Sequence, residues 1–227
     1  MREVVLDTET TGLNPKSGDK VVEIACIELI NHIPTGKCYQ TYINPMRDMP
    51  EGAFKVHGLT EQFLSDKPTF GSVVEGFLSF IEDSILLIHN AKFDINFLNY
   101  ELTLIGLDKL KFNRVTDTLQ LAREKHPGSP NNLDALCRRY SIDNNKRDYH
   151  DARLDCELLA EVYMELIGGR QHGLLLDKEI EEKIQKTNVI KNTRAKKLTE
   201  RLGSMDIKAH KSYIKSMHHK PLWDNFD

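Results

Sequence analysis

The chain opens on the stretch Val4-Val5-Leu6-Asp7-Thr8-Glu9, which passes from aliphatic residues to acids within a single predicted strand. Alternation along a strand sends residues i and i+2 to the same face, so Asp7 and Glu9 point to one side. Two carboxylates then converge at the end of the strand. Taken alone, the pair is equally consistent with two solvated acids at a strand end.

The segments that follow predict an α/β fold. Val21–Ile30 and Lys37–Ile43 are expected to form an antiparallel meander with the first strand, separated from it and from each other by loops rich in Gly, Pro and Asn. From residue 60 the apolar period becomes helical. Helices are expected at Phe70–Ile81, Asp94–Ile105, Asn132–Arg139 and Asp151–Ile167, with a short buried strand at Ile85–Ile88. This order predicts a mixed sheet flanked by helices.

Two of these helices carry an acid on their apolar side. Apolar residues follow Asp155 at +3, +4, +7 and +11, and follow Asp94 at +3, +4, +8 and +11, so both carboxylates are predicted to point inward. A buried carboxylate must be protonated, paired with a base or bound to metal, and the nearby Lys92 and Arg153 fall elsewhere on the helix. The four acids therefore predict a cage of hard oxygen ligands suited to Mg²⁺ or Mn²⁺: Asp7, Glu9, Asp94 and Asp155.

His150 directly precedes the helix that carries Asp155. A histidine can exchange a proton near neutral pH, so His150 is a candidate for deprotonating an attacking water. The chain has nine histidines, and a loop histidine is more often structural or merely exposed. Its place beside the acids favours a catalytic role. A metal pair formed by His150 and Asp151 would need further His-Asp ligands, which the sequence does not offer.

Composition excludes several classes of protein. The 227 residues are 40% hydrophobic and allow one full domain with some chain left over. No apolar run approaches the ~18–20 residues of a membrane helix, and the first residues lack the features of a signal peptide. The four cysteines form no Cys-x-x-Cys pair, which argues against a cysteine zinc site and a disulfide framework. We expect a cytoplasmic protein with reduced thiols and no membrane contact.

Charge divides the chain into a body and a tail. Residues 1–176 hold 19 Lys and Arg against 26 Asp and Glu, whereas residues 177–227 hold 12 against 8. Gly168-Gly169 closes the last predicted helix and precedes a polar stretch. We therefore expect a domain at 1–168, a linker at 169–206, and a flexible, partly helical tail at 207–227. The tail's apolar residues include Trp223, the only tryptophan, which favours a partner contact over a fraying terminus.

Three segments together resemble the DnaQ-like, or DEDDh, family of 3′–5′ exonucleases. They are residues 5–13, His89-Asn90-Ala91-Lys92-Phe93-Asp94, and His150 followed five residues later by Asp155. The resemblance implies an RNase H-like fold, two divalent ions held by the four acids, and His150 as general base. It also implies hydrolysis of the 3′-terminal phosphodiester with release of nucleoside 5′-monophosphates. The residues expected to contact substrate are Asp7, Glu9, His57, Asp155, and either Glu51 or Gly52.

Within this family the chain is similar to the proofreading subunits of bacterial replicative DNA polymerases. The similar segments include Val56–Leu59, Asn132–Cys137 and Leu158–Tyr163. This similarity implies binding to a DNA 3′ end, to the polymerase catalytic subunit and to the sliding clamp. The polymerase contact would use Leu222 and Trp223, and the clamp contact Gln171, Leu174 and Leu176. An acidic exonuclease held beside the primer end works at a high effective concentration and needs little DNA affinity of its own.

Two other functions compete with proofreading. A free-standing nuclease of the same family would trim RNA or single-stranded DNA with the same site, but the long tail with its tryptophan argues against it. A non-catalytic adaptor would keep the fold as a scaffold only. Retention of the four acids and His150 makes the adaptor a poor fit.

Overall fold

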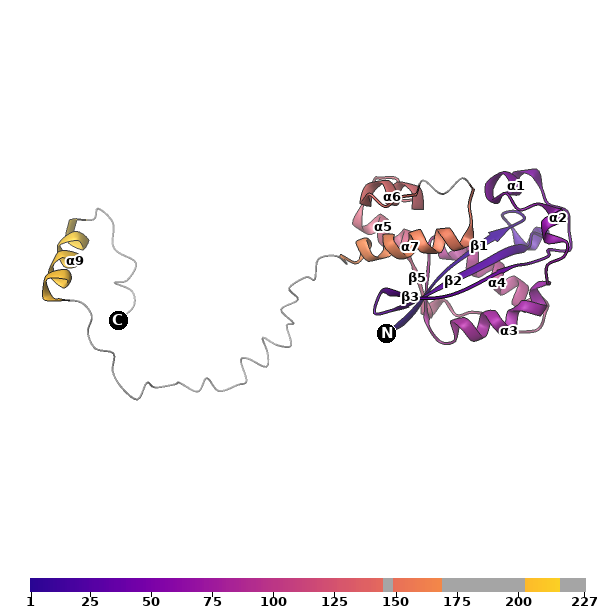
Figure 1. Ribbon diagram of the computed structural model, residues 1–227, viewed down its shortest axis with the longest axis horizontal. Helices are drawn as coiled ribbons and strands as arrows, with labels where there is room; N and C mark the ends of the chain where they lie inside the picture. Colours follow the sequence, from indigo (N-terminus) through magenta and orange to yellow (C-terminus); the bar gives the residue numbers. More distant parts are fainter. Residues whose placement is uncertain (145–148, 169–202, 217–227) are drawn as a thin grey trace. The chain divides into compact units, whose positions relative to one another are not determined.

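The computed structural model describes residues 1–144, 149–168 and 203–216 (Figure 1). The chain divides into two compact units, Met1–Leu174 and Leu175–Asp227. The expected clamp residues Gln171, Leu174 and Leu176, and the expected polymerase residues Leu222 and Trp223, lie outside the described residues. The division at 168 and 206 therefore stays a prediction.

The first unit is built on a mixed five-stranded sheet in the order β3-β2-β1-β4-β5. β1 pairs antiparallel with β2 and parallel with β4, and β4 pairs parallel with β5. The central position of β1 places its carboxyl end in the middle of the sheet edge. The strands are β1 (Arg2–Thr10), β2 (Val21–Ile30), β3 (Ile33–Tyr42), β4 (Ile85–Ile88) and β5 (Val115–Asp117). The predicted mixed sheet is confirmed.

Helices cover both faces of this sheet (Figure 1). Of the predicted helices, α3 (Phe70–Ile81) has the expected bounds, and α4 (Ala91–Leu104), α6 (Leu133–Tyr140) and α7 (Ala152–Leu166) lie within three residues of them. Six short elements were not predicted. One is the edge strand β5, and the other five are helical: η1 (Pro15–Ser17), α1 (Glu51–His57), α2 (Glu61–Leu64), η2 (Phe112–Arg114) and α5 (Thr118–Lys125).

The third strand begins earlier than its sequence indicates. The loop residues expected before Lys37 belong to β3, which starts at Ile33 and pairs with Ile30 across a two-residue turn. Asn31 and His32 occupy this turn with φ of 50° and 69°, the double left-handed conformation that suits a tight hairpin. β3 is an edge strand, and an edge tolerates Pro34 because no neighbour needs its missing N–H.

Two hydrophobic clusters lie on opposite faces of the sheet. Val4 and Leu6 of β1 belong to the cluster that includes Phe77 and Phe97 from α3 and α4. Val5 belongs to the other cluster, which contains residues of α5, α6 and α7. The alternation continues beyond the aliphatic residues. Asp7 and Glu9 therefore share the face of α7, whereas Thr8 points to the face of α4.

The second unit contributes one described helix, α9 (Ser204–Ser216). The loosely helical spacing of Ile207, Tyr213 and Ile214 predicted a helix here. It begins before the expected linker boundary at residue 206, and Gly203 donates its N–H to the Asp206 carboxylate at its first turn. No helix in the described parts of the chain is long and apolar enough to cross a membrane.

Candidate active site

The carboxyl end of β1 brings acids from three elements together. Asp7 and Glu9 extend from the central strand, Asp94 from the first turn of α4, and Asp155 from the first turn of α7. Glu9, Asp94 and Asp155 are only 7%, 2% and 4% exposed. The inward orientation predicted for Asp94 and Asp155 is therefore confirmed.

Thr8 fixes the position of Asp94. The Asp94 carboxylate accepts the Thr8 hydroxyl at 2.7 Å and the Thr8 backbone N–H at 3.2 Å. α4 begins after Asn90, which has a left-handed φ of 68° and donates its N–H to Asp117. Asp117 also caps α5 by accepting the N–H of Leu119. The strand and the helix are thus joined at the site itself.

The start of α7 positions Asp155 and His150. Asp151 caps the helix by accepting the Leu154 N–H at 2.8 Å. His150 Nδ1 lies 3.2 Å from an Asp155 carboxylate oxygen, and the His150 N–H donates to the Val56 carbonyl. The His150 side chain is 48% exposed, so it is accessible from solvent. A ligand atom from each of Glu9, His150 and Asp155 lies within 4.8 Å of the other two.

The clustered acids perturb one another. Burial raises the pKa of Asp7 well above its usual range, and the charges of Asp94, Glu9 and Asp155 raise it further. Burial likewise raises the pKa of Asp94 to about 7, although the hydrogen bonds from Thr8 oppose this shift. Such mutual repulsion disfavours four ionised carboxylates unless a cation lies among them. The donor set therefore fits a divalent hard cation that prefers carboxylate oxygens.

These residues line a cavity of about 560 Å³. The predicted substrate residue His57 forms part of its wall and is buried, with Nδ1 accepting the Leu59 N–H at 3.0 Å. Burial lowers the pKa of His57, so its ring favours the neutral form. Gly58 follows with φ of 70°, and a Cβ there would lie 3.1 Å from the Tyr149 ring. This close contact packs Tyr149, the residue before His150, against the end of α1.

The two candidates at the start of α1 lie in different places. Gly52 lines the cavity, whereas Glu51 does not. The Glu51 carboxylate points to solvent and pairs with Lys55 at 2.6 Å. A substrate contact from this loop would therefore come from the Gly52 backbone in the arrangement seen here. Asp134 lies near the start of α6 and accepts a hydrogen bond from Asn144.

Sequence reasoning missed the apolar part of the cavity wall. Leu13, Val56 and Phe93 line it together with the acids. The sequence did carry a signal, because each of the three is an apolar residue next to a motif residue. In the structure, the side chains of Leu13 and Val56 are 85% and 46% exposed.

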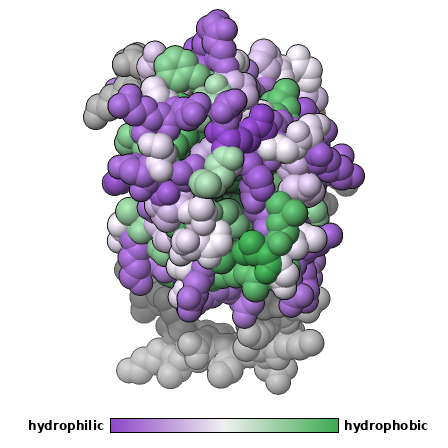
Figure 2. Space-filling view, turned by 90° about the vertical axis from the view of Figure 1, so that its right-hand side faces the viewer, coloured by the Kyte–Doolittle hydropathy of each residue, from purple (hydrophilic) through white to green (hydrophobic). Residues whose placement is uncertain are grey.

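The side of the molecule that carries α1 and α2 is predominantly hydrophilic, with one group of hydrophobic side chains in the lower half of the view (Figure 2).

Comparison with known proteins identifies the family. The family model described as "Exonuclease" matches residues 4–163. The chain belongs to this exonuclease family. A relative from Rickettsia felis, DNA polymerase III subunit epsilon, is 46% identical over 222 residues, which cover 96% of this chain and 97% of the relative. The protein of the same name from Salmonella typhimurium is 49% identical over 176 residues, covering 74% and 72%.

Solved structures of other exonucleases share the fold. The nuclease domain of 3'hExo, a DEDDh family member bound to rAMP, aligns with a TM-score of 0.63 at 17% identity, covering 74% of this chain and 92% of that one. Exonuclease X in complex with 5' overhanging duplex DNA gives a TM-score of 0.57 at 23% identity, with the same coverage. At these identities the similarity establishes the DEDDh exonuclease fold alone.

Proposed function

We propose that this protein is the 3′–5′ proofreading exonuclease of a bacterial replicative DNA polymerase. The observation that carries the proposal is the convergence of four acids and His150 in one cavity of a chain whose relatives are DNA polymerase III epsilon subunits over nearly their whole length. The substrate is the 3′ end of a DNA strand, and the products are nucleoside 5′-monophosphates. We place this activity in the cytoplasm, where bacterial chromosomes are replicated.

Two divalent ions, Mg²⁺ or Mn²⁺, held by Asp7, Glu9, Asp94 and Asp155 would supply Lewis-acid stabilisation of the phosphate charge. The chain's own residues provide the rest. His150 is half-exposed at the mouth of the cavity and takes a proton from the attacking water through its ring. Asp155, 3.2 Å from His150 Nδ1, orients the imidazole and stabilises its protonated form. Thr8 holds Asp94 in place throughout.

The cavity selects a terminal nucleotide by its shape. Leu13, Val56 and Phe93 offer apolar contacts to the base and sugar, and buried His57 provides a polar wall. In this proposal the terminal nucleotide leaves the duplex before it enters the cavity. A mispaired end separates at a lower cost than a paired end. Preference for mismatches thus follows from fraying and needs no recognition of the wrong base.

The partners in this proposal are the DNA 3′ end, the polymerase catalytic subunit and the sliding clamp. Residues 207–227, with Leu222 and Trp223, would bind the polymerase, and Gln171, Leu174 and Leu176 would bind the clamp. A tethered exonuclease gains a high effective concentration at the primer end, which compensates for the acidic balance of residues 1–176. Coelution with the polymerase subunit, lost in Trp223→Ala, tests the first contact.

The activity is tested by digestion of a 5′-labelled single-stranded DNA with Mg²⁺. We expect a ladder that shortens from the 3′ end, is abolished in Asp7→Ala, is strongly reduced in His150→Ala and is slowed by a 3′-phosphate. The control Asp83→Asn removes an exposed acid far from the motifs and should behave as the wild type. A folded wild type that is inert with both Mg²⁺ and Mn²⁺ would reject the proposal.

A further inference from the structure

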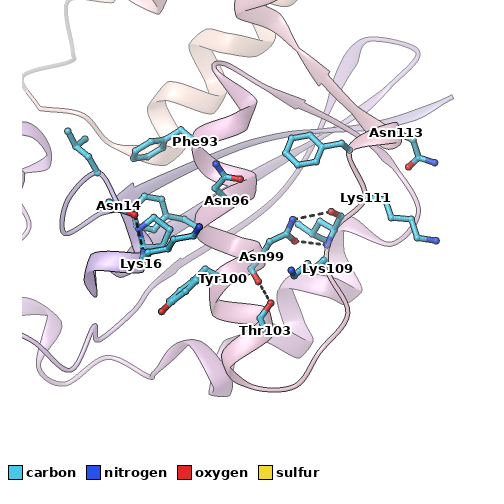
Figure 3. A pocket seen from close by; sticks show the side chains of 15 residues that line it. Asn14, Lys16, Phe93, Asn96, Asn99, Tyr100, Thr103, Lys109, Lys111 and Asn113 are labelled. Atoms are coloured by element: carbon cyan, nitrogen blue, oxygen red, sulfur yellow. Dashed lines mark hydrogen bonds between the residues drawn. The ribbon is translucent and has the colours of Figure 1, made fainter.

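A second hollow, of about 920 Å³, lies next to the active-site cavity (Figure 3). Leu13 and Phe93 line both hollows, so the two adjoin each other at these side chains. We propose that this groove holds the unpaired DNA strand on the 5′ side of the bond that is cleaved. The inference rests on the proposed exonuclease function and extends it to the path of the substrate strand.

The charge of the groove is opposite to that of the cavity. Its described lining residues include Lys16, Lys109 and Lys111 and no acid. All three lysines are exposed, and none forms an ion pair with another described residue. Other basic side chains of this unit are paired, such as Lys20 with Glu101 and Arg47 with Asp19. Unpaired lysines are suited to bind phosphates, because affinity for a nucleic-acid backbone comes from cations that displace its counterions.

The groove also presents aromatic rings. Tyr100 of α4 is half-buried in the lining (Figure 3), and Phe112, which also lines the groove, is 53% exposed. Aromatic rings beside a basic track are the combination with which proteins bind single strands, because any base can stack on a ring. Asn96 and Asn113 add polar groups to the lining. A chain of phosphates and exposed bases matches both features, whereas a purely apolar peptide matches only one.

The walls of the groove are held in place by hydrogen bonds. The Asn99 side chain donates to the Leu110 carbonyl at 3.2 Å and accepts the Leu110 N–H at 2.6 Å, which fixes the lysine-bearing segment to α4. On the other side, Asn14 accepts the Lys16 N–H at 3.1 Å. From Phe93 to Thr103, α4 extends about 15 Å. This is the length of about four stacked nucleotides.

A third hollow offers an alternative path but fits the strand less well. It adjoins the active-site cavity on another side and shares Asp7, His150 and Asp155 with it. Its described lining holds a single Lys or Arg, Arg123, together with a further acid, Asp134. Phosphates would meet more negative and less positive charge there. The lysine-bearing groove is therefore the favoured path.

Two substrates separate the groove from the cavity. The full chain is assayed with Mg²⁺ on a single strand of about 12 nucleotides, long enough to fill the groove. It is also assayed on the p-nitrophenyl ester of thymidine 5′-monophosphate, which fills the cavity alone. For Tyr100→Ala, we expect the ratio of kcat/KM for the strand to kcat/KM for the ester to fall about ten-fold. Tyr100→Phe keeps the ring and should restore the ratio.

Salt dependence tests the lysines. In Lys111→Ala, we expect the slope of log(kcat/KM) for the strand against log[salt] to become shallower by about 0.7, the value for one lost contact to single-stranded phosphate. Lys37→Ala removes an equal charge from the edge strand β3, where Lys37 is 74% exposed, and should leave the slope unchanged. Melting temperatures of all variants check that they are folded.

The outcomes distinguish the two proposals. If the wild type cleaves neither substrate, the exonuclease function itself is wrong. If it cleaves both, and the ratio and the slope stay at wild-type values in folded Tyr100→Ala and Lys111→Ala, the strand does not follow the groove. That result overturns the inference and leaves a protein partner as the occupant to test.

Discussion

The two ends of β1 handle buried acids in opposite ways. Near its start, Arg2 donates to Glu28 of β2 at 2.7 Å, and the hydrogen bonds of Arg2 and Thr35 lower the pKa of Glu28 to about 2. At its carboxyl end, burial and neighbouring charges raise the pKa of Asp7 well above its usual range. A paired acid stabilises the fold. An acid that faces mainly other acids destabilises it, which marks that end as functional.

The largest expected effect comes from breaking the acidic end. Asp7→Asn keeps the shape of the side chain and removes its charge, and we expect exonuclease activity to fall about 10³-fold. Because the raised pKa means that the ionised Asp7 destabilises the metal-free fold, the same change should raise the melting temperature in EDTA by at least about 2 °C. A digestion assay and a thermal melt measure the two effects.

The test requires that Asp7→Asn lower the activity and raise the melting temperature in EDTA. Asp83→Asn removes an exposed acid and should alter neither quantity. If Asp7→Asn instead lowers the melting temperature in EDTA, the repulsion at the carboxyl end of β1 has been misjudged.

Replacing the general base His150 should lower exonuclease activity less than replacing the metal ligand Asp7. For His150→Gln, we expect kcat to fall about 10²-fold, the lower end of what proton transfer contributes, with KM nearly unchanged. His126→Gln is the control, because His126 contacts Tyr140 away from the cavity. Steady-state kinetics on a single strand give both constants. A rise in KM with an unchanged kcat would assign His150 to substrate binding instead.

Metal binding should stabilise the fold through Asp7 at the carboxyl end of β1, and not through the Arg2–Glu28 pair near its start. At Mg²⁺ concentrations near 100 times the dissociation constant, we expect the free energy of unfolding to rise by about 2.7 kcal/mol. Thermal melts with and without Mg²⁺ measure this rise, which should persist in Glu28→Gln and vanish in Asp7→Asn. An equal rise in Asp7→Asn would place the ion elsewhere.

The long elements of the fold were predictable because their patterns are strong. α3 and α7 have apolar stripes over 12 and 15 residues, and the aliphatic β4 has no other plausible interpretation. α1 and α2 have seven and four residues, too few for a periodic signal, and they form because tertiary contacts hold them. The His150 N–H bonded to Val56 is one such contact.

The acids of the site were predictable for the same reason that the helices were. Asp94 and Asp155 each lie on the apolar stripe of a helix, where burial of a charged carboxylate is unfavourable. Such an acid is therefore easy to recognise in the sequence. Partners far apart in the chain give no such signal. Thr8 holds Asp94 across 86 residues, and Arg2 pairs with Glu28 across 26. Whether a buried acid is paired or unpaired therefore required the structure.

The smallest effect tests the paired end directly. Because the folded-state pKa of Glu28 lies below the usual 4.5, its contribution to stability is complete above pH 4.5 and is lost as the pH falls toward about 2. We expect Glu28→Gln to lower the free energy of unfolding by about 2 kcal/mol at pH 7. Denaturant titrations at a series of pH values should show the difference shrinking below pH 4.5. Glu157→Gln breaks an exposed pair with Arg153 and should cost only about 0.3–0.5 kcal/mol. A Glu28→Gln difference that persists unchanged at low pH would mean that packing, and not the charge of Glu28, stabilises this end of β1.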